Sequence, residues 1–251
     1  MEMRNIISPV LAIFKYSARK ILFNKRWLIT LLMILLAAGI MGYAGSRDID
    51  ALDYGADFMD IMILSFMMPI IAMIHGASLI RNEIDDKSIT QVITAPLDRR
   101  IAYLGYYVAL AVSLSMIMLL INVAGWLAFF LQKGVSADSL AILASMSAMS
   151  VIGALVYSAL FLAVGTIFSK PVYFSLFYAF VWEAFIGSVP GAISHYTVKH
   201  FVRSLGSAWI DHGDLASYDG AGVGTALLVL AALTAVLLVM GATVFREKEY
   251  P

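Results

Sequence analysis

Cysteine is absent from the 251 residues of this chain, which excludes disulfides, thiolate metal sites and cysteine nucleophiles. Charged residues are scarce at 14%, and 17 basic side chains are balanced by 17 acidic ones, so no basic surface for nucleic acid is expected. The chain also lacks a GxxxxGK[ST] phosphate-binding loop and the HExxH and GxSxG motifs. We therefore expect no catalytic residues, no metal site and no cofactor bound by this chain itself.

Hydrophobic residues, in contrast, are in large surplus. They make up 61% of the chain, with a mean hydropathy of +0.88, whereas soluble domains contain about 45–50%. The surplus has to face lipid, where only helices and closed barrels satisfy their backbone hydrogen bonds. Apolar runs of about 20 residues span a bilayer as helices. The sequence predicts a single all-α transmembrane domain over residues 1–251, with six spans at 27–43, 61–80, 101–131, 139–168, 172–190 and 221–245.

Two further segments have a helical pattern without being spans. Residues 4–26 carry an apolar stripe opposite basic side chains, which predicts an amphipathic helix in the membrane interface. Residues 191–220 separate the last two spans. Within them Thr197, Phe201, Leu205 and Trp209 fall on one stripe, which predicts a short external helix.

The distribution of basic residues predicts the orientation of the spans. Only Arg47, Lys133, Lys199 and Arg203 fall on one side, and the other Lys and Arg residues fall on the side that also contains both termini. Because basic residues concentrate on the cytoplasmic side, we expect both termini in the cytoplasm and the chain in the cytoplasmic membrane. The opposite face carries an acidic group, which we expect in the first external loop: Asp48, Asp50, Asp53, Asp57 and Asp60.

The connection between the second and third spans, residues 81–100, is the most informative stretch. It reads RNEIDDKSITQVITAPLDRR, with charges at both ends and a short apolar stripe between them. Most such charge runs are solvated loops that only set topology. A short polar helix here is also suited to a cleft on a soluble partner, with ion pairs fixing its orientation. The candidate docking residues are Arg81, Glu83, Asp85, Asp86, Ser88, Pro96 and Arg99.

This stretch resembles the permease subunit of type-2 ABC transporters. Glu83 and Asp85 match an acidic pair, Ser88 stands where the family has Thr, and Pro96, Arg99 and Gly105 fall at the expected places. Two positions depart from the pattern, Lys87 in place of Gly and Tyr106 in place of Lys. The layout of the whole chain is similar too: a basic entry helix, six spans, and an external excursion before the last one.

The resemblance implies a division of labour between chains. A separate ATP-binding subunit would bind ATP and Mg, two permease chains would pair, and each would dock its ATPase through residues 81–100. It also implies export, whereas lipid, glycan, peptide, drug and ion substrates all stay open. This chain would be a non-catalytic conduit.

Glu183 is the only acidic residue deep inside a predicted span. An ionised carboxylate there costs about 2.5–3.5 kcal/mol on insertion scales, so its side chain should face the bundle interior. It is a candidate for the translocation path, and a structural contact between helices is the equal alternative. A stand-alone proton- or ion-coupled transporter that uses Glu183 is the second functional hypothesis. His75 and Asn122 are expected to form hydrogen bonds between helices.

Overall fold

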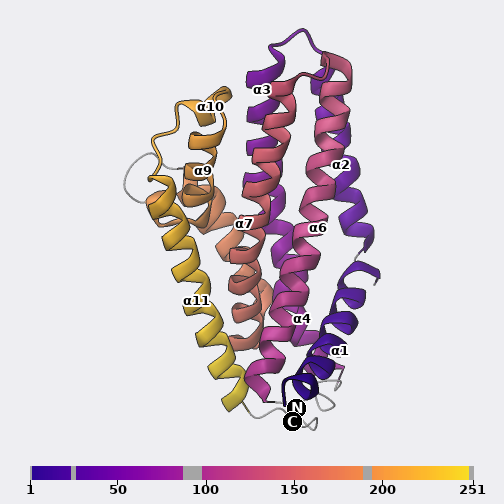
Figure 1. Cartoon of the computed structure of the whole chain (residues 1–251), viewed down its shortest axis with the longest axis vertical. Helices are drawn as coiled ribbons and strands as arrows, with labels where there is room; N and C mark the ends of the chain where they lie inside the picture. The colour runs from indigo at the N-terminus through magenta and orange to yellow at the C-terminus, as the bar shows by residue number, and fades with distance from the viewer. Residues whose placement is uncertain (1, 24–26, 87–97, 189–193, 249–251) are drawn as a thin grey trace.

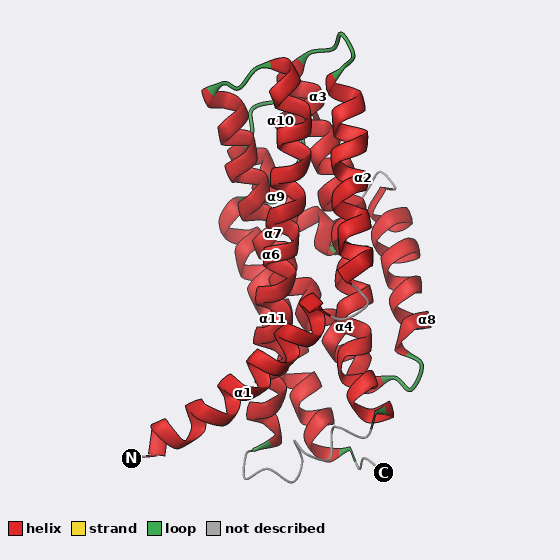
Figure 2. Ribbon diagram, turned by 90° about the vertical axis from the view of Figure 1, so that its right-hand side faces the viewer, coloured by secondary structure: helices red, strands yellow, loops and turns green. Residues whose placement is uncertain are grey.

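The computed structural model describes residues 2–23, 27–86, 98–188 and 194–248, and every regular element in these ranges is helical. Its first helix is α1 (Glu2–Phe23), which leaves the bundle at an angle (Figure 2). The long helices are α2 (Trp27–Gly45), α4 (Met68–Asp85), α6 (Arg99–Lys133), α7 (Ala137–Ile167) and α11 (Val223–Glu247). The shorter elements are α3 (Ala51–Phe58), α8 (Pro171–Leu176), α9 (Val198–Trp209), α10 (Gly213–Ala216), the π-helices η1 (Met59–Met67) and η2 (Phe177–Phe185), and two 3₁₀ turns, η3 (Ile186–Ser188) and η4 (Ser194–Tyr196).

Helices α6 and α7 form the centre of the bundle. Helix α6 packs against α1, α2 and α7, and α7 packs against α4, α6 and α11. The predicted interhelical hydrogen bonds are present: Asn122 donates to Ser150 at 2.8 Å, joining α6 to α7, and His75 lies 3.3 Å from Thr30, joining α4 to α2. Helices α4 and α7 approach closely because Gly165 has no side chain. A Cβ there would lie 2.6 Å from the Ala77 carbonyl oxygen.

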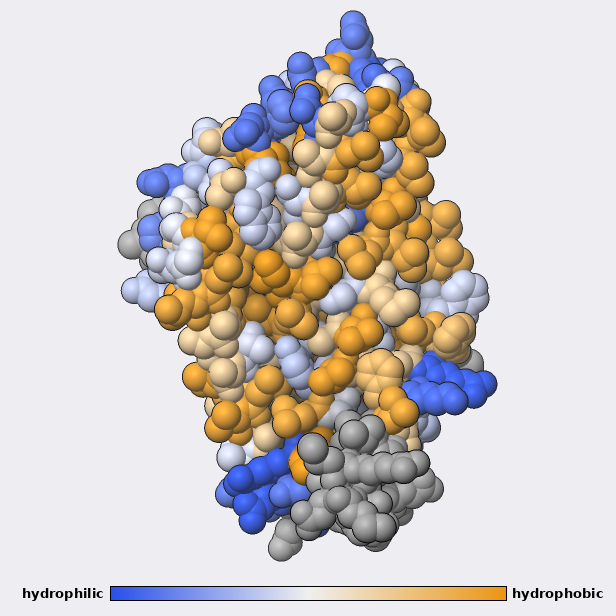
Figure 3. All heavy atoms as spheres, in the orientation of Figure 1, coloured by the Kyte–Doolittle hydropathy of each residue, from blue (hydrophilic) through white to orange (hydrophobic). Residues whose placement is uncertain are grey.

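The two ends of the bundle are distinct (Figure 1). At the basal end, α4 ends at Asp85, α6 begins at Arg99, and the start of α1 and the end of α11 lie nearby. At the distal end lie α3, α10 and the turn between Lys133 and Ala137. An apolar belt covers the face shown in Figure 3, between polar surfaces at both ends. This is the surface that a bilayer requires.

Five helical stretches of the described residues are long and apolar enough to cross a membrane: 27–45, 51–85, 99–133, 137–167 and 223–247. They account for five of the six predicted spans. The remaining one, 172–190, is helical from Pro171 to Ser188, but it changes from α- to π- to 3₁₀-helix and is not among the five. Residues 189 and 190 lie outside the described ranges.

The second span begins earlier than the prediction of 61–80. The chain is helical from Ala51, because the Asp50 side chain accepts hydrogen bonds from the Leu52 and Asp53 amides and caps α3. Three of the acidic residues predicted in an external loop, Asp53, Asp57 and Asp60, therefore lie on a helix instead, in α3 and η1. Asp48 and Asp50 precede α3. Pro69 at the start of α4 has no amide hydrogen. The preceding turn is π-helical, and the Met68 amide bonds to the Ile63 carbonyl.

Residues 191–220 contain the helix α9, as the sequence predicts, but its buried stripe differs in part. Val198, Val202 and Leu205 are buried, whereas Trp209 is exposed. The Thr197 side chain caps this helix by accepting from the His200 amide. Of the predicted stripe, Thr197 and Leu205 are buried and Phe201 is half-buried. The buried face extends to Val198 and Val202 because α7, α10 and α11 pack against the helix.

Candidate functional site

At the basal end, a buried ion pair ties α1 to the start of the predicted docking segment. The Lys20 ammonium lies 2.7 Å from Glu83 and 3.4 Å from Asp86. The Glu83 side chain is 1% exposed, whereas that of Asp86 is 64% exposed. Burial alone would lower the pKa of Lys20, but the hydrogen bond and charge of Glu83 outweigh it and the pKa is raised. Lys20 is therefore a cation at neutral pH, and α1 and α4 are joined by charge.

The other candidate docking residues are divided between two places. Arg81 and Asp85 form an ion pair at 2.7 Å along one face of α4. Arg99 instead donates to the Arg246 carbonyl at 3.2 Å, so the start of α6 contacts the end of α11. Ser88 and Pro96 lie outside the described residues.

These contacts show which of the side chains face the bundle and which are exposed. Glu83 faces α1, whereas Asp85 and Asp86 remain largely exposed beside residue 87. Sequence reasoning missed the role of Lys20, because its basic face was assigned entirely to the membrane surface. The i, i+4 spacing of Arg81 and Asp85 was the one pairing visible in the sequence.

The Glu183 carboxylate is fully buried and is bound to the beginning of α9. Its Oε1 accepts from the Tyr178 hydroxyl at 2.6 Å and from the Val198 amide at 3.0 Å. Its Oε2 accepts from the Lys199 amide at 3.1 Å. The first amides of a helix have no partner inside the helix and carry partial positive charge. A carboxylate at this place therefore satisfies both the amides and its own oxygens, and Glu183 holds α9 against η2.

A second buried carboxylate holds the middle of the same helix. Asp60 in η1 is 1% exposed and lies 2.9 Å from the Arg203 guanidinium. Arg203 also stacks over the Tyr218 ring, 4.5 Å from its centre. This pair could not be predicted while Asp60 was expected in an external loop. The signal was present, since Asp53, Asp57 and Asp60 recur at spacings of three and four, which is one face of a helix.

The remaining acids of that face fix the turn after α9. Asp53 accepts from the Gly213 amide at 3.0 Å, and Asp57 accepts from the Asp214 amide at 2.6 Å. Gly213 adopts a φ of 64°, in the left-handed region that favours glycine, and a Cβ there would lie 2.2 Å from Asp57. The acidic group on α3 and η1 thus fastens the segment that contains α9 and α10 to the distal end.

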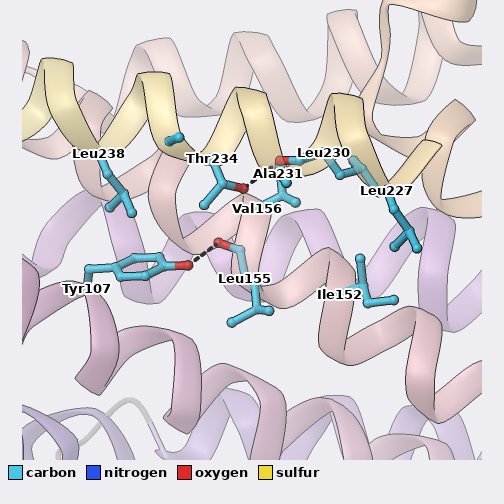
Figure 4. A pocket seen from close by; sticks show the side chains of 10 residues that line it. Tyr107, Ile152, Leu155, Val156, Leu227, Leu230, Ala231, Thr234 and Leu238 are labelled. Atoms are coloured by element: carbon cyan, nitrogen blue, oxygen red, sulfur yellow. Dashed lines mark hydrogen bonds between the residues drawn. The ribbon is translucent and has the colours of Figure 1, made fainter. Parts of the chain in front are cut away.

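An apolar groove of about 400 Å³ lies on the side of the bundle, between α6, α7 and α11 (Figure 4). Its ten lining residues include no charged side chain. The two side-chain hydroxyls among them already donate hydrogen bonds within the protein. The Tyr107 hydroxyl donates to the Leu155 carbonyl at 3.4 Å, and the Thr234 hydroxyl donates to the Leu230 carbonyl at 2.8 Å. The groove therefore presents hydrocarbon to the bilayer.

The apolar belt, the five membrane-length helices and the charged basal end define a multi-pass membrane protein. The chain matches the ABC-2 family transporter protein family over residues 13–189, well over half of its length, and it belongs to that family. It is a permease, the membrane component of an ABC transporter, and its family works with an ABC ATP-binding subunit. No curated protein matches the chain. Helices α9, α10 and α11 lie beyond the matched range.

Proposed function

We propose that this permease couples ATP hydrolysis by a separate ATP-binding subunit to export, with the 81–100 segment as the docking element. The observation that carries the proposal is the Lys20–Glu83 ion pair, which joins α1 to α4 at the start of the segment. A force applied to residues 87–97 by a moving ATPase would act on α4, on α6 and, through Lys20, on α1. The segment is thus attached to three helices and is suited to transmit motion into the bundle.

The distribution of charge supports a cytoplasmic basal end. Most basic residues of the chain lie in or beside the segments that meet there, and such residues concentrate on the cytoplasmic side of membranes. The proposed arrangement therefore has both termini in the cytoplasm and α9 on the outer side. A second permease chain completes the transporter, and ATP and Mg are bound by the partner subunit.

The alternative of a stand-alone carrier uses Glu183 as the coupling group. Membership of the ABC-2 family favours an ATP-driven permease. The environment of Glu183 also weakens the alternative, because three hydrogen bonds already hold its carboxylate. A proton carrier would need this group to be accessible from both sides of the membrane.

The docking role is tested by charge reversal at an exposed position. Asp86→Lys changes a side chain that is largely solvent-exposed at the basal end, whereas Asp138→Lys makes the same change on an exposed side chain at the distal end. We expect Asp86→Lys to reduce recovery of the ATP-binding subunit with the tagged permease, and Asp138→Lys to leave it unchanged. Equal recovery with both variants would remove the docking role from this segment.

A further inference from the structure

Helix α9 is short and its position depends on contacts with other elements. It has 12 residues, and isolated helices of this length are only marginally stable in water. Two buried carboxylates hold this helix in place. Glu183 binds the amides of its first turn, and Asp60 binds Arg203 near its middle. Because the two acids come from different segments, η2 and η1, α9 is attached to two parts of the bundle at once.

Both acids lie on π-helical turns. The Met68 amide bonds to the Ile63 carbonyl five residues back, which is the π-helical spacing. The Ile186 amide is shared between the Val181 carbonyl at that spacing and the Trp182 carbonyl at the α-helical spacing. Such π-bulges occur frequently at functional sites. Conversion of either turn to α-helix would rotate its residues by about 100°, one residue's share of a turn. That rotation would turn Asp60 or Glu183 away from α9.

The contact made by Asp60 is incomplete. One carboxylate oxygen binds Arg203, but within the described part of the chain the other oxygen, Oδ1, is buried without a hydrogen-bond partner. Buried polar groups in permanently packed positions are nearly always satisfied, and each exception calls for an explanation. A contact that must break and re-form in a working cycle provides one, because a fully satisfied network would hold α9 too firmly.

We propose that α9 is a latch on the distal end of the permease, closed by Asp60 and Glu183, which is released at one stage of the ATP-driven cycle. Release frees the underside of α9, formed by Val198, Val202 and Leu205, from the bundle. The proposal rests on the proposed function for the source of the motion. The closed state itself depends only on contacts within this chain.

The absence of natural cysteine allows a direct test by thiol labelling. Val202→Cys places a thiol on the buried underside of α9, and Ala208→Cys places one on its exposed side as a reference. The complex of permease and ATP-binding subunit, in lipid nanodiscs, is treated with a polar maleimide with and without ATP. We expect the labelling rate of Val202→Cys, relative to the reference, to rise at least tenfold with ATP.

The same thiol reports on the latch residues in the permease alone. Asp60→Asn removes the charge that binds Arg203, and we expect it to raise the labelling rate of Val202→Cys without ATP. Asp138→Asn is the matched control, because it removes an exposed charge from the first turn of α7, and it should leave the rate unchanged.

The outcomes separate the latch from the proposed function. If the ATPase binds and turns over but Val202→Cys stays protected in every nucleotide state, the latch is wrong and the permease assignment stands. If no ATP-binding subunit associates, the proposed function fails. Labelling of the permease alone still tests whether Asp60 holds α9 closed. Equal labelling of the Asp60→Asn and Asp138→Asn variants would then overturn the latch as well.

Discussion

The ion pair between Lys20 and Glu83 should stabilise the fold far more than the ion pair between Lys20 and Asp86 does. Lys20→Met leaves the Glu83 carboxylate, 1% exposed, without its cation. Breaking a buried pair in this way costs about 3–5 kcal/mol. The Lys20 side chain is 19% exposed, so partial screening places the cost near the lower bound, about 3 kcal/mol. Asp86→Asn removes only an exposed partner, and the expected cost is below about 1 kcal/mol.

The assay is a double-mutant cycle measured by denaturant unfolding in detergent micelles. Lys20→Met, Glu83→Gln and the double variant give the coupling energy between the two side chains. The same cycle with Asp86→Asn provides the control on the same lysine. We expect the first coupling energy to be clearly larger than the second. Equal coupling energies, or no coupling between Lys20 and Glu83, would refute the reasoning that α1 is tied to α4 by a buried charge.

Three further predictions concern other contacts. Glu183→Ala should destabilise the protein by several kcal/mol, because three donors lose their charged acceptor. Each such hydrogen bond contributes about 1.5–3 kcal/mol, and relaxation of the structure around the alanine recovers part of the sum. Unchanged stability in chemical unfolding would contradict this. Burial, with the nearby His195 and Arg203, lowers the pKa of His200. The stability that neutral His200 contributes is therefore complete above about pH 6.5 and is lost as the pH falls through the pKa of His200 in the folded protein. In thermal melts, the melting temperature of His200→Phe should depend less on pH than that of the unchanged protein. Gly165→Ala should lower the stability of the protein by about 1–3 kcal/mol, because the added methyl group overpacks against α4. Gly39 has open space around it, so Gly39→Ala should be neutral or slightly stabilising. Equal melting temperatures of the two variants would argue against the close packing of α4 and α7.

The sequence was sufficient to predict the long spans because lipid imposes a simple rule on length and composition. The predicted span 101–131 lies within α6, and the predicted span 221–245 overlaps α11 from residue 223 onward. The rule fails where a helix carries charge on a face that another part of the protein covers. Residues 51–60 were assigned to a loop for this reason, since their carboxylates bind α9 and α10 and not water.

The position of the candidate site could be predicted from the sequence, but only some of the residue pairs that form it could. The sequence pointed to charged residues 81–86, but Lys20 is more than 60 residues away, and a contact at that separation leaves no local pattern. Glu183 was recognised from its depth in a span. Its partners are backbone amides of Val198 and Lys199, which every residue type provides, so side-chain chemistry does not reveal them.

The proposed function requires that this chain transmits the work of an ATPase across the membrane. The most direct measurement is affinity purification of the tagged permease from its native host, with mass spectrometry of the partners and an ATPase assay on the purified material in nanodiscs. We expect stoichiometric recovery of an ABC ATP-binding subunit, with ATP turnover that Asp86→Lys reduces and Asp138→Lys leaves intact. Recovery of the permease alone, without ATPase activity, would contradict it.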